Sequence, residues 1–187
     1  EGEVLLRQRQ WAPAASALRK ALDKQAPGTA PNKLYQALAR SDKPADADSF
    51  ASQWMKTHPR DTGLLFTMGE MAQAKGDAAS AQKHYEQLLS IQADHATALN
   101  NLAMLLLQQK KPGALPFAQR AVRAAPQEPA ILDTLALAQA AEGMVGEAVE
   151  TQKQALALAP DRFALAGFSM GGYVAFEILR RALQKVE

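Results

Sequence analysis

The sequence predicts an all-α protein, built as a solenoid of antiparallel helix pairs. The first observation behind this prediction is composition: alanine supplies 39 of the 187 residues and leucine 24, whereas valine and isoleucine together supply 9. Alanine and leucine favour helices, and β-branched residues favour strands. The second observation is an internal period, because small residues recur every 33 or 34 positions. A period of this length indicates stacked units, each made of a few secondary-structure elements.

Two columns of small residues carry the period. The first is a column of alanines spaced 33, 34, 33 and 34 apart: Ala14, Ala47, Ala81, Ala114 and Ala148. The second lies upstream and contains one large exception: Gly2, Tyr35, Gly69, Ala103 and Ala136. A small residue at a fixed place in each unit indicates that two helices approach closely there. The units end at Pro59, Ala93, Pro126 and Pro160, and a proline at such a place stops the second helix of a pair.

Apolar periodicity and turn residues place the individual helices. In order along the chain, the expected helices are 11–24, 30–40, 44–57, 62–75, 78–91, 96–109, 113–124, 130–142 and 145–159. Pro13 falls in the first turn of its helix, where the missing N–H is tolerated. Gly2 falls at the eighth position of its unit, so the residues before Trp11 are expected to be the second half of a first helix. We therefore expect the chain to be an excerpt from a longer array.

One helix pair cannot bury its own apolar face, so neighbouring pairs must cover it. The leucines expected in this shared core recur at helical spacing: Leu34, Leu38, Leu65, Leu99, Leu102, Leu132 and Leu135. Trp54, Tyr85 and Phe117 fall on second helices and are expected to fill gaps between pairs. A ligand-binding role for these aromatics is the alternative.

The units resemble the tetratricopeptide repeat, a helix-turn-helix unit of 34 residues with a small residue in its first helix, an alanine in its second and a closing proline. The unit that starts near Leu65 shows the pattern in Gly69, Ala81 and Tyr85. The resemblance covers residues 1–160 and implies a right-handed superhelical solenoid of about five repeats. It also implies a non-catalytic scaffold for protein–protein interaction.

Three short stretches narrow the resemblance. Residues 58–61, 98–103 and 129–135 look like parts of bacterial envelope arrays, and the nearest suggestion is the repeat lipoprotein of exosortase (PEP-CTERM) systems. Membership would imply a scaffold in the periplasm or cell envelope, near exopolysaccharide machinery. The alternatives are a cytoplasmic location and a purely structural spacer.

In this family the first helix of each pair lines the concave surface, which suits an extended peptide or a partner helix. Carried over one position at a time, the resemblance implies a partner-binding surface of nine residues: Asn32, Gln36, Phe66, Glu70, Gln73, Asn100, Met104, Asp133 and Leu137. The alternative for each is an ordinary solvated helix position. Asn101 could serve a clamp for a terminal carboxylate, but Ala130 and Thr134 stand where the cations of that clamp belong. The clamp is therefore not expected.

The net charge, the absence of cysteine and the placement of the histidines exclude several other classes of protein. The net charge is +2 without a block of like charge, so a nucleic-acid partner is not expected. There is no cysteine, and His58, His84 and His95 lack the spacing of metal ligands, so neither a metal nor another cofactor is expected. No apolar run approaches the ~20 residues of a membrane span.

Residues 161–187 break the period and are expected to be an atypical tail, a capping helix, a truncated pair or foreign sequence. Residues 162–181 resemble the nucleophile elbow of α/β-hydrolases, in which G-x-S-x-G exposes a serine, here Ser169. The histidine and aspartate that must follow this serine are absent, since only Glu177 and Glu187 remain. We therefore predict no enzyme activity, with an esterase- or lipase-like serine hydrolase fragment as the alternative. Docking of this tail into a neighbouring copy is a further possibility that the sequence leaves open.

Overall fold

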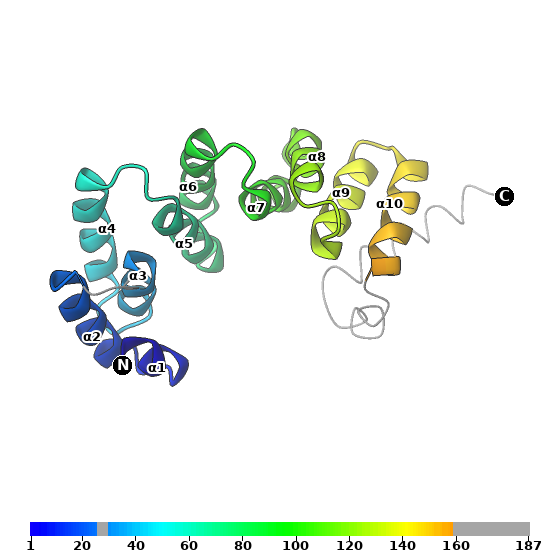
Figure 1. Ribbon diagram of the computed structural model, residues 1–187. Helices are drawn as coiled ribbons and strands as arrows, with labels where there is room; N and C mark the ends of the chain where they lie inside the picture. The colour runs from blue at the N-terminus through cyan, green and yellow to red at the C-terminus, as the bar shows by residue number, and fades with distance from the viewer. Residues whose placement is uncertain (26–29, 159–187) are drawn as a thin grey trace. The chain divides into compact units, whose positions relative to one another are not determined.

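The structure is a computed structural model that describes residues 1–25 and 30–158. In these two ranges every regular element is an α-helix and there is no β-strand, as Figure 1 shows. The all-α prediction is confirmed. The tail, residues 161–187 with Ser169 and the elbow-like segment, lies outside the described residues.

The described helices follow the predicted order. They are α1 (Gly2–Arg7), α2 (Trp11–Asp23), α3 (Pro31–Ala39), α4 (Ala45–Thr57), α5 (Thr62–Ala74), α6 (Ala78–Ile91), α7 (Ala96–Gln108), α8 (Ala114–Ala124), α9 (Pro129–Ala141) and α10 (Val145–Leu158). The bounds predicted for α2 to α10 differ from these by at most one residue, apart from Ala159, which lies outside the described residues.

The chain divides into two compact units, Glu1–Ile91 and Gln92–Glu187. In the first unit α1 packs on α2, α3 on α4 and α5 on α6, and α3 also contacts α2 and α5. In the second unit α7 packs on α8 and α9 on α10, and α9 also contacts α7 and α8. Each unit is therefore a stack of helical hairpins in which consecutive first helices touch. We call α1, α3, α5, α7 and α9 the A helices, and the others the B helices.

Four of the five turns between paired helices share one backbone device, which the turn between α3 and α4 lacks. Gly76 and Gly143 have a φ of +78°, and Arg9 and Lys110 take the same left-handed conformation at the corresponding places. After α5, the Asp77 N–H donates to the Ala72 carbonyl and the Gly76 N–H donates to the Gln73 carbonyl. This pair of bonds satisfies the last carbonyls of a helix before the chain reverses.

Most of the predicted core is buried. Six of the seven leucines are at most 6% exposed, whereas Leu135 is half-buried. Tyr85 is fully buried, but it packs within its own hairpin, where its ring faces Gly69. Trp54 and Phe117 are half-buried, so they belong to the edge of the core.

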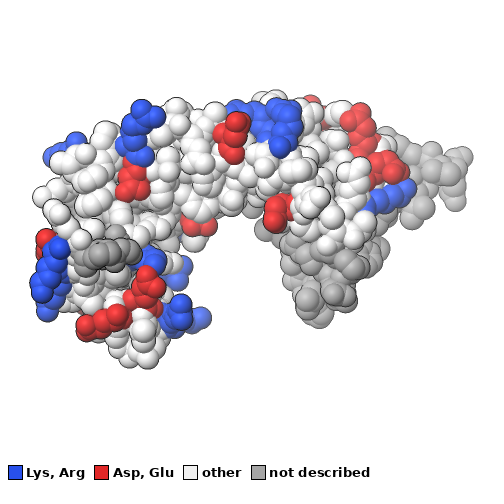
Figure 2. Space-filling view, in the orientation of Figure 1, with Lys and Arg blue, Asp and Glu red and all other residues white. Residues whose placement is uncertain are grey.

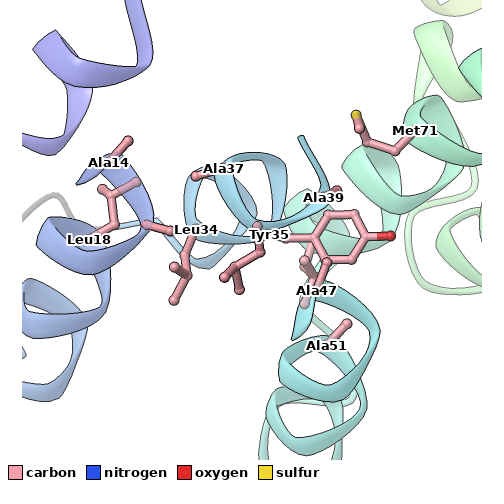
Figure 3. Close-up of a cluster of buried hydrophobic side chains, with 12 residues drawn as sticks. Ala14, Leu18, Leu34, Tyr35, Ala37, Ala39, Ala47, Ala51 and Met71 are labelled. Atoms are coloured by element: carbon pink, nitrogen blue, oxygen red, sulfur yellow. The ribbon is translucent and has the colours of Figure 1, made fainter. Parts of the chain in front are cut away.

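Tyr35, the one large residue in the column of small residues, is accommodated by a small residue on the helix with which it is paired. Gly69 of α5 faces the Tyr85 ring of α6, and a Cβ on Gly69 would lie 2.5 Å from Tyr85 Cε1. One repeat earlier the sizes are reversed, because Tyr35 stands in the A helix and Ala51 in the B helix. Figure 3 shows the Tyr35 ring beside α4, near Ala47, with Ala51 one turn farther along the helix. These two hairpins therefore each hold one large ring, supplied by α3 in the first and by α6 in the second.

His84, on α6, makes the stability of the folded chain depend on pH. Its Nδ1 is buried, and no described group lies within hydrogen-bond distance of that atom. Burial lowers the pKa of His84, and Lys83 lowers it further, whereas Gln87, Asp77 and Asp48 act in the opposite direction. The folded chain therefore binds a proton at this site less readily than the unfolded chain does.

We expect thermal stability to fall as the pH drops below about 6.5, the ordinary pKa of histidine, and to level off below the folded-state pKa of His84. The sign follows because the unfolded state takes up more protons in this window, so stability rises with pH there. Melting temperatures of wild type and His84→Gln between pH 7.5 and 5 check this. The variant should show a shallower slope than wild type. Identical slopes in wild type and His84→Gln would contradict the assignment.

Candidate functional site

The nine residues of the predicted binding surface all lie on A helices. Asn32 and Gln36 lie on α3, which packs against α5; Phe66, Glu70 and Gln73 lie on α5. In the second unit Asn100 and Met104 lie on α7, and α7 packs against α9, which carries Asp133 and Leu137. The nine side chains thus form two groups, one on each unit. Glu70 is exposed and the other eight are half-buried.

Two members of the set are committed to bonds inside their own hairpins. The Tyr85 hydroxyl donates to Gln73 Oε1 at 2.9 Å. The Gln152 amide donates to Asp133 Oδ1 at 2.8 Å. A partner that uses Gln73 or Asp133 has to share these groups, so both residues are better placed to fix the helices than to select a ligand.

The remaining residues of the first unit offer a mixed surface. Phe66 is half-buried, with its ring centroid 6.2 Å from that of Tyr85. Partial loss of hydration raises the pKa of the Glu70 carboxyl, and the charge of Arg40 works against that shift. A carboxylate in this setting gains from a nearby cation, because the ionised form is incompletely hydrated.

In the second unit an amide stands beside apolar side chains. Asn100 Oδ1 is buried, and no described donor lies within hydrogen-bond distance of it. Its amide nitrogen makes only a long contact of 3.4 Å with Asn101 Oδ1. Met104 and Leu137 are half-buried on the same pair of contacting helices, α7 and α9. An amide flanked by apolar side chains suits recognition of a peptide, which presents both backbone polar groups and apolar side chains.

The charges of the described surface are mixed in sign. On the face drawn in Figure 2, blue and red atoms alternate and much of the surface is white. Within residues 1–25 and 30–158, no three acidic or histidine side chains gather closely enough to hold a metal ion. No helix in the described part of the chain is both long and apolar enough to cross a membrane.

Sequence reasoning missed a cleft on the B helices of the first unit. Its lining includes a stripe along α4: Asp46, Ser49, Phe50, Gln53, Trp54 and Thr57. These residues follow the spacing of a single helix face, which the sequence displays. The family resemblance points to the A helices instead, so the prediction did not include this face.

Comparison with known protein families finds a match over one helical hairpin. Residues 62–95, which comprise α5, α6 and the turn after them, match the tetratricopeptide repeat family. A TPR repeat-containing protein of Pseudomonas aeruginosa is 28% identical over 128 residues, which is 67% of this chain and 22% of that protein. The chain thus spans less than a quarter of the length of this curated relative.

Solved structures share the fold. A structure of MamA from Desulfovibrio magneticus RS-1 is 23% identical with a TM-score of 0.62, and the match covers 82% of this chain and 94% of that one. A tetratricopeptide repeat protein from Parabacteroides merdae is 14% identical with a TM-score of 0.73, and the match covers 98% of this chain and 72% of that one. At these identities the likeness shows the fold.

Proposed function

Because the chain is a tetratricopeptide repeat protein, we propose that it is a non-catalytic scaffold that binds a peptide or partner protein in the concave groove that the A helices line in this family. The observation that supports this proposal is the surface of those helices. Half-buried apolar side chains, Phe66 and Met104 among them, stand next to amides and next to the exposed Glu70 carboxylate. This mixture can bury apolar side chains of a partner and bond its backbone.

The exposed negative charge of Glu70 adds a preference for basic residues in the partner. A lysine or arginine brought next to this carboxylate would favour the ionised form that partial burial disfavours. The resemblance to envelope arrays adds the further proposal that binding takes place in the bacterial cell envelope. Fractionation of source cells that carry the full-length protein would check the location.

A pull-down from source-cell extract tests the binding surface. We expect wild type to retain a partner and the Phe66→Ala/Met104→Ala variant to lose most of it, because truncating an apolar anchor in an interface typically weakens binding by about tenfold or more. The matched control is Phe117→Ala/Met55→Ala, which removes the same residue types from half-buried positions on B helices. Equal retention by the first variant and wild type, or equal loss in both variants, would contradict the assignment of the surface.

The non-catalytic part of the proposal has its own assay. Ser169 lies outside the described residues, and as a hydrolase nucleophile it would need a histidine base; no histidine lies between Ser169 and Glu187. Hydrolysis of a p-nitrophenyl ester should be the same for wild type and Ser169→Ala. Serine-dependent turnover would replace the scaffold by a hydrolase.

A further inference from the structure

A cleft of about 550 Å³ runs along α4 in the first unit. One wall is the stripe of α4 from Asp46 to Thr57, and the other is the last turns of α2, with Arg19, Leu22 and Asp23. Leu34 of α3 also lines it. All of these elements belong to the first unit, and none of the nine residues of the predicted binding surface lines the cleft.

The cleft contains a pair of aromatic side chains held in place. The rings of Phe50 and Trp54 have centroids 6.0 Å apart and planes tilted by 32°, and both side chains are half-buried. The Trp54 indole N–H donates to Asp61 Oδ2 at 2.9 Å, and the ring stacks on His58 at 3.9 Å. The indole is therefore anchored by groups outside the cleft, so a ligand meets a preformed apolar surface.

The rim of the cleft is charged, with an excess of acid. Asp23 and Asp46 are exposed carboxylates, and Arg19 is the single cation among the lining residues that the structure describes. Neither carboxylate forms an ion pair or a side-chain hydrogen bond with any residue that the structure describes. Two carboxylates against one guanidinium favour a ligand that brings positive charge to the rim.

We propose that this cleft is a second protein-docking site, and that it accepts an amphipathic helix whose apolar face carries lysine or arginine at its edge. The stripe from Asp46 to Thr57 spans three turns of α4, which is ~16 Å at the rise of an α-helix. Apolar side chains of the docked helix would lie against Phe50 and Trp54, and its basic side chains would pair with Asp23 and Asp46. This is the mode in which a helix fills a groove and is anchored at spacings of three and four residues.

The chain provides its own reporter for a binding test. It has two tryptophans, so the Trp11→Phe background leaves Trp54 as the only source of indole emission. The probe is a synthetic 14-residue helical peptide with leucines on one face and lysines at the edge of that face. The matched peptide has glutamate in place of every lysine. Titration of Trp54 emission gives the Kd of each peptide.

We expect saturable binding of the lysine peptide and at least about tenfold weaker binding of the glutamate peptide. Asp23→Asn/Asp46→Asn should weaken the lysine peptide by about threefold or more, whereas the exposed control Asp42→Asn/Asp94→Asn should not. Phe50→Ala should weaken it by about tenfold, with circular dichroism to confirm folding. Gln53→Arg, an exposed lining residue, should also weaken it without affecting the fold.

The proposal is overturned if the lysine peptide does not saturate, if both peptides bind equally, or if the two aspartate double variants behave alike. Phe50→Ala could lose peptide affinity simply because it unfolds, and in that case Gln53→Arg decides. Unchanged affinity of Gln53→Arg for the lysine peptide also overturns the proposal. Phe66→Ala/Met104→Ala should bind the peptide like wild type. This last result keeps the docking cleft independent of the surface proposed on the A helices.

Discussion

Replacing Gly69 by alanine is expected to destabilise the protein by about 1–3 kcal/mol, although alanine is the better helix former. The added Cβ would lie 2.5 Å from Tyr85 Cε1 and 2.8 Å from Tyr85 Cδ1. The Tyr85 ring has no room to retreat, because it is fully buried and its hydroxyl is bonded to Gln73. Chemical denaturation monitored by circular dichroism measures the change, and hydrogen exchange in α5 and α6 locates it.

The effect of Gly69→Ala on stability should change sign when the Tyr85 ring is absent. Tyr85→Ala alone should cost about 3–5 kcal/mol, the usual range for removal of a buried aromatic ring. In that background Gly69→Ala should become stabilising by about 0.5–1 kcal/mol, because the clash is gone and only the helix preference remains. Additive effects of the two substitutions would show that Gly69 and Tyr85 do not limit each other.

Trp54→Ala is expected to lower the free energy of unfolding by about 2–3 kcal/mol, somewhat less than a fully buried tryptophan would. The indole connects α4 to the start of α5, because its N–H donates to Asp61 Oδ2 while Asp61 Oδ1 accepts from the Leu64 N–H at 2.9 Å. Its loss removes packing against Phe50 and His58 and leaves one oxygen of the capping carboxylate without its partner.

Two further variants separate the contribution of ring packing from that of the hydrogen bond to Asp61. Trp54→Phe keeps a six-membered ring but loses the bond to Asp61 and part of the ring packing, so it should cost about 1–2 kcal/mol. Asp61→Ala removes the helix cap together with that bond and should cost about 1–2 kcal/mol. Thermal melts of the full chain compare the three. A melting temperature of Trp54→Ala equal to that of wild type would place this side chain on the surface, without a structural role.

The helices were predictable because their signals are local and repeated. The alanine column fixes where B helices meet A helices, and glycines such as Gly76 and Gly143 mark the turns, so nine helices were placed to within one residue. The half-burial of Trp54 could not be predicted in this way. Its environment depends on where the indole N–H finds an acceptor, and that acceptor, Asp61, belongs to the next helix.

The candidate site was predictable only in part. The family resemblance identifies which helix of each pair presents a surface, and the structure places all nine residues on A helices. Gln73 accepts a hydrogen bond from Tyr85, twelve residues away, and Asp133 accepts one from Gln152, nineteen residues away. No sequence pattern specifies the rotamers that bring these side chains together. The cleft beside α4 was missed because it depends on how far apart α2 and α4 lie, which side-chain volumes decide.

The alternating placement of the large ring limits how this gene could have been rearranged. A crossover that joined the A helix carrying Tyr35 to the B helix carrying Tyr85 would force two rings into one space. The reciprocal chimera, Gly69 opposite Ala51, would leave that space empty. An exchange between these two repeats must therefore keep α3 with α4 and α5 with α6, so the hairpin, and not the single helix, is the unit that can move between them.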